Sequence, residues 1–361
     1  MKLLVCIFLL LFLASCGQAV DNDNENDASQ NQDNQAEETY LHEGYETQDQ
    51  DETASGIHGL LSVVQYGDNR AYIMGSIHIG RESWYPLTPA AEAAMERADI
   101  FAFEIDLSTE GGPCLCESDC DDCDCDPDAD DCICLLLEMM LFSDDETLLT
   151  FLPPDVYKIF MANLRTFPVN TDAVQVFRPT TISEVILYQI IAPSLGLSSD
   201  HSIDMYVFNR AEELGRPVIG LTDFNDHIAF VSGMPDEYQI ATARYFSDFD
   251  TMMEETEELA YVYEIQDIET LRDMVRLGLA DAYEAYAAGE ISAGGLGLAR
   301  YWHHTVGNYR SAFFAQQIAD LLTQTEEPTT FFVTVGIAHL TREVNVFDTL
   351  REMGFEVEGL Y

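Results

Sequence analysis

Two short apolar runs, each ended by a glycine that a histidine follows three residues later, constrain this chain most. The first is YIMGSIHIG at residues 72–80, and the second is FVTVGIAHLT at residues 332–341. Short apolar runs that stop at glycine predict buried β-strands. His78 and His339 then follow the carboxyl ends of their strands, where open α/β sheets form ligand crevices. We therefore expect both imidazoles to face one shared site.

The remaining patterns predict an α/β fold: a central mixed β-sheet flanked by helices, with a largely helical middle section. Apolar residues at i, i+3 and i+4 spacing indicate helices through residues 234–289. A helix followed by a strand at 204–221 is typical of α/β folds. Further strands are expected at 60–65, 72–74, 100–105, 329–335 and 354–357, and further helices at 89–98, 135–142, 154–164, 180–191, 301–322 and 342–353.

The amino terminus predicts export and lipid anchoring. Residues 1–15 have a short apolar stretch after Lys2, too short to span a bilayer, and the segment before Cys16 resembles a bacterial lipobox. This predicts acylation of Cys16 and an extracytoplasmic protein held on a bacterial membrane, at the outer membrane or cell surface, by its lipid alone. An ordinary signal peptide is the alternative. Residues 16–55 form an acidic linker without Lys or Arg, and the folded domain is expected at 56–361.

The charge of the chain is strongly one-sided, with 65 Asp and Glu against 16 Lys and Arg, a formal net charge of −49. Binding of nucleic acid needs clustered Lys and Arg, so this class of partner is excluded. Docking on anionic lipid headgroups is disfavoured for the same reason. The acidic surface serves either solubility or the attraction of cations and cationic peptides.

A cysteine-rich insert is predicted at residues 108–134, where seven of the nine cysteines alternate with aspartates. In an oxidising compartment disulfides are the default interpretation. A metal cluster held by thiolates and carboxylates is the second interpretation, and a mobile acidic loop is the third. None of the three identifies the main activity.

The candidate chemistry lies at the predicted strand ends. Glu104 ends the strand at 100–105, and together with His78 and His339 it offers imidazole nitrogens and a carboxylate, which suit Zn²⁺, Mn²⁺ and related cations. An open site for such a cation lowers the pKa of bound water to about 7 and supports hydrolysis. A satisfied structural histidine is the alternative at either position.

Four blocks of sequence, in order, carry a family resemblance. They are GSIHIG with FAFEIDL, the run SIDMYVFNRAEELGRPVIGL that contains Asp204, YRSAFFAQQI that contains Arg310, and FFVTVGIAHLTREVNVFDTLREMGFEV. Over residues 57–361 the chain resembles the TraB/GumN family, which includes the Tiki metalloproteases. The resemblance implies a fold related to erythromycin-esterase-like and ChaN-like proteins, and metal-dependent hydrolysis of peptide bonds with Mn, Co or Zn as cofactor.

The resemblance also implies roles for single residues. His78 and His339 would bind the metal or polarise the substrate carbonyl, Glu104 would be a ligand or general base, and Arg310 would stabilise an oxyanion or hold a substrate carboxylate. Supporting positions near the substrate or behind the ligands are Gly75, Gly336, Asp106, Asp204 and His304.

The chain departs from the family pattern at several positions. Ser311 replaces an asparagine, Thr222-Asp223 replaces Glu-Thr, and His227 falls where a glutamine is common. The cysteine-rich insert is also foreign to the pattern. The resemblance and the site residues together predict a surface-tethered metallohydrolase with a peptide or protein substrate. The alternative is a lipoprotein that uses the same cleft to bind a peptide or a metal without catalysis.

Overall fold

The computed structural model describes residues 57–107, 140–142, 145–167, 169–223, 235–245, 249–275, 287, 300 and 307–360. The predicted signal peptide, lipidated Cys16, acidic linker and cysteine-rich insert lie outside these ranges, as do all nine cysteines. In the described part of the chain, no helix combines the length and the apolar character needed to cross a membrane.

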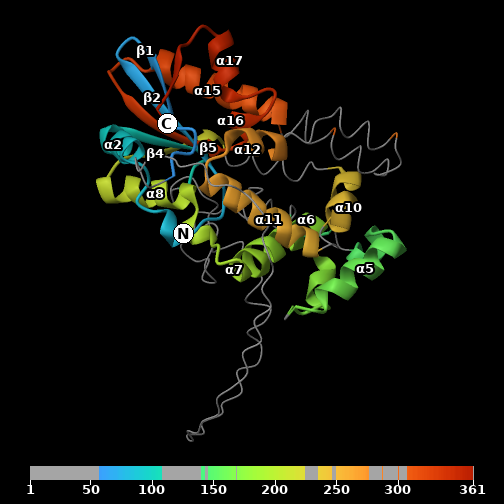
Figure 1. The fold of residues 1–361 in the computed structure, drawn as a ribbon. Helices are drawn as coiled ribbons and strands as arrows, with labels where there is room; N and C mark the ends of the chain where they lie inside the picture. The colour runs from blue at the N-terminus through green and yellow to red at the C-terminus, as the bar shows by residue number, and fades with distance from the viewer. Residues whose placement is uncertain are drawn as a thin grey trace, which may run out of the picture.

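A six-stranded mixed sheet lies at the centre of the fold, in the order β4-β3-β5-β2-β1-β6 (Figure 1). The neighbours β4, β3, β5 and β2 run parallel, whereas β1 is antiparallel to both β2 and β6. The predicted α/β class with a mixed sheet is confirmed. The strands are β1 (Ser62–Tyr66), β2 (Asn69–Ser76), β3 (Ile100–Ile105), β4 (Val218–Thr222), β5 (Thr330–Gly336) and β6 (Val357–Gly359).

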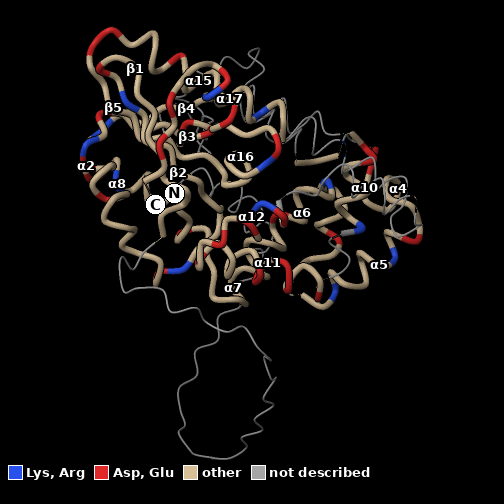
Figure 2. The backbone as a smooth tube through the Cα atoms, turned by 45° about the horizontal axis from the view of Figure 1, so that its top comes forward, with Lys and Arg blue, Asp and Glu red and all other residues tan. Residues whose placement is uncertain are grey.

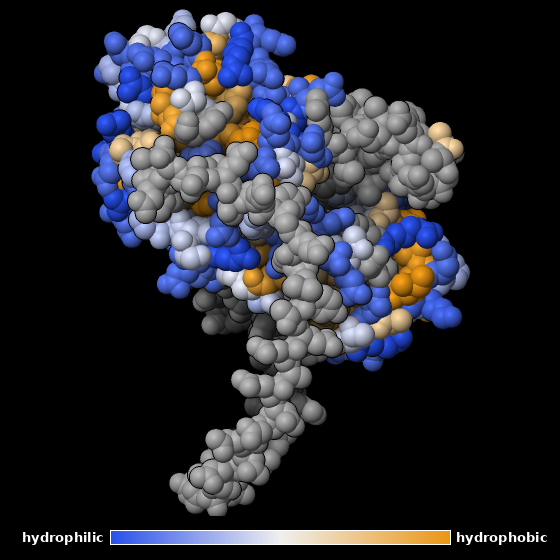
Figure 3. Space-filling model, in the orientation of Figure 1, coloured by the Kyte–Doolittle hydropathy of each residue, from blue (hydrophilic) through white to orange (hydrophobic). Residues whose placement is uncertain are grey.

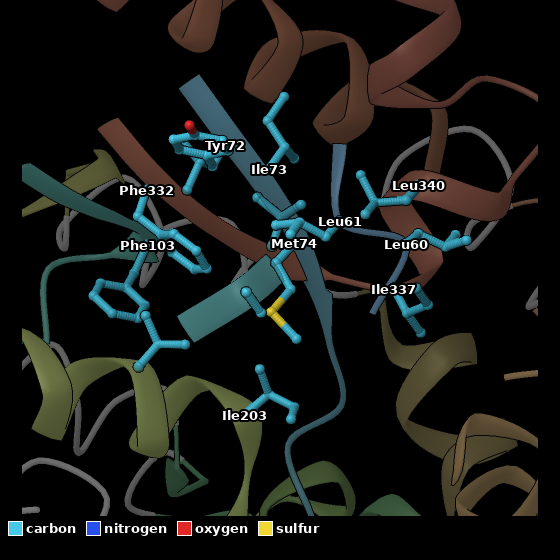
Figure 4. Close-up of a cluster of buried hydrophobic side chains, with 14 of the residues drawn as sticks. Leu60, Leu61, Tyr72, Ile73, Met74, Phe103, Ile203, Phe332, Ile337 and Leu340 are labelled. Carbon is cyan, nitrogen blue, oxygen red and sulfur yellow. The ribbon is translucent and has the colours of Figure 1, made fainter. Parts of the chain in front are cut away.

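Helices cover both faces of this sheet. The helices α2 (Pro89–Arg97) and α8 (Ile203–Leu214) pack on one face, and α15 (Arg310–Gln324) and α17 (Val346–Glu352) pack on the other (Figure 1). Strands covered on both faces have continuous apolar runs rather than alternation, as residues 71–74 of β2, 100–103 of β3 and 331–333 of β5 do. Figure 4 shows the resulting core, in which Phe103, Phe332 and Met74 are buried.

The middle of the chain forms a helical lobe with a second hydrophobic cluster, built on Leu148, Phe160 and Ile186 among others. An apolar surface patch lies over this lobe near α5 (Figure 3), and charged residues are spread over the outer helices and loops (Figure 2). The remaining helical segments are η1 (Glu82–Trp84), α4 (Leu148–Phe151), α5 (Pro154–Leu164), η2 (Ala173–Val176), α6 (Pro179–Ile186), π-helical η3 (Leu187–Ile191), α7 (Ala192–Ser194), η4 (Ser199–His201), α10 (Asp236–Tyr245), α11 (Phe249–Glu264), α12 (Ile268–Val275) and α16 (Ala338–Thr341).

The predicted start of the helix at 342–353 is wrong. The chain forms the short helix α16, leaves it at Arg342 in an extended conformation, and begins α17 only at Val346. Asn345 causes this restart, because its side chain accepts a 2.9 Å hydrogen bond from the backbone N–H of Asp348. A side-chain cap of this kind marks a helix start. His339 therefore lies in a short helix of its own.

Candidate functional site

Three adjacent parallel strands bring their carboxyl ends to one edge of the sheet. Strand β5 lies between β2 and β3, with Ser76 paired to Gly336 and Phe103 paired to Thr334. The residues that follow these strands therefore share the same edge. This places the two Gly-x-x-His turns and Glu104 in one region.

Glu104 is the centre of a compact polar cluster. Its Oε1 accepts a 2.8 Å hydrogen bond from the backbone N–H of Gly336, and its Oε2 accepts a 3.1 Å bond from the Arg310 guanidinium. The Nε2 atom of His339 lies 3.7 Å from Oε1. Burial would raise the pKa of Glu104, but the guanidinium of Arg310, the charge of His78 and the Gly336 N–H lower it below its usual value. Glu104 is therefore ionised at neutral pH.

His339 is held as a neutral, buried imidazole. Burial lowers the pKa of His339 to about 4, against the opposing attraction of Glu104. Arg310 is then the cation that neutralises Glu104. The Nδ1 atom of His339 hydrogen-bonds Ser311 Oγ at 3.0 Å, and the ring meets Phe314 edge-on at a centroid distance of 5.0 Å. The hydroxyl of Ser311 thus fixes the ring of His339.

His78 belongs to a second, more open pair. Its Nδ1 atom lies 3.1 Å from Oδ2 of Asp204, whose Oδ1 accepts a 2.9 Å hydrogen bond from the hydroxyl of Ser76. Asp204 stands in the first turn of α8, which Ser202 caps. Burial alone would lower the pKa of His78, but Asp204 raises it to about 9, with smaller contributions from Glu104 and Glu184. Solvent reaches 59% of the His78 side chain and screens this attraction.

The two pairs belong to one electrostatic environment, since His78 interacts with both Glu104 and His339. In each histidine the Nδ1 atom has a hydrogen-bond partner, which leaves Nε2 for a ligand. Histidines that bind metals are usually oriented in this way. Within the described ranges, no three His, Cys, Asp or Glu side chains are arranged to hold a metal ion.

The two glycines before the histidines have packing roles. A β-carbon on Gly75 would overlap the side chain of Ile337. The carbonyl oxygen of Gly75 accepts a 2.7 Å hydrogen bond from the buried hydroxyl of Tyr263. A β-carbon on Gly336 would come within 3.2 Å of Glu104 Oε1. Gly336 therefore contacts the site directly, whereas Gly75 fixes the strand end that leads to His78.

The other predicted site residues are placed as follows. Asp106 follows β3 and is half-buried, and Thr222 ends the neighbouring strand β4. His304 and His227 lie outside the described residues.

The prediction missed Glu184 on α6, which interacts electrostatically with His78. Glu184 is the only charged residue between Pro179 and Ile191. That isolation was the one signal in the sequence that could have revealed it.

The sequence matches a family model along almost all of the described part of the chain. The model, described as the TraB/PrgY/gumN family, matches residues 60–359. The chain belongs to the TraB/PrgY/gumN family. Comparisons with curated proteins and with solved structures gave no match. The family match includes both histidines, Glu104, Asp204 and Arg310, so these residues lie within the shared TraB/PrgY/gumN domain.

Replacing Asp204 by asparagine is expected to lower the pKa of His78 in the metal-free protein by at least about one unit, because the neutral amide no longer favours the imidazolium. Because the pKa of His78 is higher in the folded protein than its unfolded value of 6.5, the protonated imidazole stabilises the fold below that pH. This stabilisation is lost as the pH rises toward about 9. The stability lost by Asp204→Asn should therefore be larger at pH 6 than at pH 9.5. NMR titration and urea unfolding measure both quantities, with Asp200→Asn as control.

Equal pKa values of His78 in the Asp204→Asn and Asp200→Asn variants would contradict this account. They would mean that solvent screens the carboxylate of Asp204 completely.

Proposed function

We propose that this member of the TraB/PrgY/gumN family is a metal-dependent hydrolase of peptide bonds, tethered to the cell surface. The observation that supports the proposal most is the buried cluster of Glu104, Arg310 and His339 at the sheet edge that also carries His78. An ionised carboxylate beside a neutral imidazole is a combination suited to proton transfer and to metal binding.

The donor types of the site suit a divalent cation, although no three of its imidazole and carboxylate side chains are arranged to hold one in the described ranges. His339 Nε2 and Glu104 Oε1 lie 3.7 Å apart, and both histidines have Nδ1 engaged by a partner. We propose that His78 completes the set, because its ring is exposed at the same edge. Imidazole and carboxylate donors suit Zn²⁺, Mn²⁺ and Co²⁺. Since ligating imidazoles are neutral, binding would displace the proton that Asp204 favours on His78.

The residues of the site would have separate roles in hydrolysis. A bound divalent cation would supply Lewis-acid activation of water and carbonyl. As the alternative to its role as a ligand, the Glu104 carboxylate would accept the proton of the attacking water, since it is ionised at neutral pH. Arg310 would place positive charge near the oxygen on which negative charge develops. It is held for this role by Glu104 and by the ring of Phe314, whose centroid is 5.0 Å from the guanidinium carbon.

A non-catalytic binder is the second candidate function. It is favoured by the hydrogen bonds that already engage both oxygens of Glu104, from Gly336 and Arg310. In that case the cluster would hold the sheet edge in place and the same edge would bind peptide without turnover.

Metal analysis beside a peptide-cleavage assay decides between the two. The purified protein, His78→Ala and His339→Ala are incubated with a peptide library and Mn²⁺, Co²⁺ or Zn²⁺. We expect cleavage by the wild type and a loss of at least about 100-fold in each variant, together with reduced metal content. His201→Ala is the control, because the structure uses the backbone carbonyl of His201 in its contact with Tyr85. Peptide binding without cleavage under any metal would establish the binder instead.

A further inference from the structure

Helix α11 connects the helical lobe to the edge of the sheet that carries the site (Figure 1). Near its start, Met252 is buried in the second hydrophobic cluster, which belongs to the lobe. Near its end, Ala260 and Tyr263 are buried in the main cluster around the sheet. The helix has 16 residues, which correspond to a length of about 24 Å. One continuous helix therefore joins the two hydrophobic clusters.

The last two residues of α11 contact the chain on both sides of His78. The hydroxyl of Tyr263 donates a 2.7 Å hydrogen bond to the carbonyl oxygen of Gly75, three residues before the histidine. The carboxylate of Glu264 accepts a 2.7 Å hydrogen bond from the guanidinium of Arg81, three residues after it. The end of the helix thus holds both ends of the segment from which His78 projects.

The two contacts differ in strength. Tyr263 is 1% exposed, and its ring packs against Trp84 at a centroid distance of 5.5 Å. The hydrogen bond from Tyr263 is buried, and a buried carbonyl that loses its donor is costly. The side chains of Arg81 and Glu264 are 26% and 41% exposed, so solvent screens their ion pair. Tyr263 therefore makes the stronger contact, and Glu264 adds a weaker one.

His78 depends on such support because its own side chain is largely exposed. Solvent reaches 59% of it, and its Nδ1 atom pairs with Asp204, which belongs to a different segment of the chain. The direction of the ring is then set by Asp204 and by the backbone of the turn. Groups that lie behind a metal-binding imidazole and fix its orientation influence the affinity of the site almost as strongly as the ligands do.

We propose that Tyr263, with weaker support from Glu264, is a positioning residue of the site, through which the helical lobe fixes the backbone that carries His78. This proposal rests on the proposed role of His78 in binding the divalent cation. Tyr263 acts on the cation only through the turn, since the residue that it contacts is Gly75 and not the histidine itself.

The test compares Tyr263→Phe with Tyr261→Phe in the purified full chain. Each variant loses one hydroxyl group from α11, but Tyr261 is 55% exposed and serves as the matched control. NMR spectra of histidine-labelled, metal-free protein report the ring signals of His78 and His339, assigned with the alanine variant of each. Titration with Co²⁺, followed by its visible absorption, then measures the affinity of the site for a divalent cation.

We expect Tyr263→Phe to shift the ring signals of His78, to leave those of His339 in place, and to weaken Co²⁺ binding by about tenfold, as for a residue that orients a ligand. Tyr261→Phe should match the wild type in all three measurements. A role in stability alone would lower the urea midpoint without moving the signals of His78 in the folded protein, so unmoved signals overturn the proposal. Equal shifts of both histidines would also overturn it, because the change would not be confined to the turn.

Glu264→Gln should weaken Co²⁺ binding less, by about threefold, because a partly exposed ion pair contributes little. Glu258→Gln removes the same charge from the exposed surface of α11 and is its control. Equal weakening in both variants would show an effect of net charge and reject the supporting role of Glu264. If the wild type binds no divalent cation, the metal-dependent function is rejected, whereas the NMR comparison still decides whether Tyr263 positions His78.

Discussion

Replacing Glu104 by alanine is expected to destabilise the protein by about 3 kcal/mol, the range found when one partner of a buried ion pair is removed. The change deprives the nearly buried guanidinium of Arg310 of its carboxylate and leaves the Gly336 N–H without its 2.8 Å acceptor. Urea unfolding monitored by circular dichroism measures the loss. Any hydrolytic activity should fall with it by at least about 100-fold, because the proposed general base is gone.

A double-mutant cycle separates the ion pair from the packing of the two side chains. Arg310→Met removes the charge and keeps an unbranched apolar side chain beside Phe314. If the pair carries the effect, Glu104→Ala should cost much less in the Arg310→Met background than in the wild type. Additive losses would show that the two residues act independently and that the 3.1 Å contact contributes little.

The sequence predicted the strand ends of the site well, because they depend on local patterns. The apolar strand at 100–105 is observed with these same bounds, and the parallel order of β2, β5 and β3 brings the two histidine turns and Glu104 to one edge. Buried parallel strands have continuous apolar runs, so they are easily distinguished from the acid-rich segments of this sequence. The glycine before each histidine is equally visible.

The parts that sequence did not reveal depend on contacts between distant segments. Glu184 is separated from His78 by about a hundred residues, and nothing in the local pattern of α6 indicates that they interact. The resemblance marks Ser311 as a departure from the family pattern, yet its hydroxyl holds the ring of His339. The opposite protonation of the two histidines also has no local signal, because burial near Arg310 decides one and Asp204 decides the other.

Gly80→Ala is expected to disturb the site indirectly, through the backbone, and to lower the free energy of unfolding by about 3 kcal/mol or more. A β-carbon on Gly80 would overlap the backbone carbonyl of His201, which no rotamer change can relieve. Gly80 and Ser198 also exchange two backbone hydrogen bonds of 2.9 Å, and each net bond contributes about 1 kcal/mol. Overpacking of a rigid contact costs about 1–3 kcal/mol in addition.

The consequence for the site follows from the position of this contact. Gly80 lies two residues after His78, and His201 lies three residues before Asp204, so the contact holds the two segments that form the exposed pair. If the segments move apart, the pKa of His78 should fall toward its ordinary value, which NMR titration measures in the metal-free protein.

Gly67→Ala is the matched control for Gly80→Ala. It adds the same methyl group at a turn where nothing lies within 4 Å of the new β-carbon. The positive φ of 58° at Gly67 is then the only source of destabilisation. That conformation costs an alanine about 1 kcal/mol, and the change should leave the pKa of His78 as it is. If Gly80→Ala were no more destabilising than Gly67→Ala, the segments around His78 and Asp204 would be adjustable, and the pair would owe its geometry to the hydrogen bond between the side chains rather than to the backbone contact beneath it.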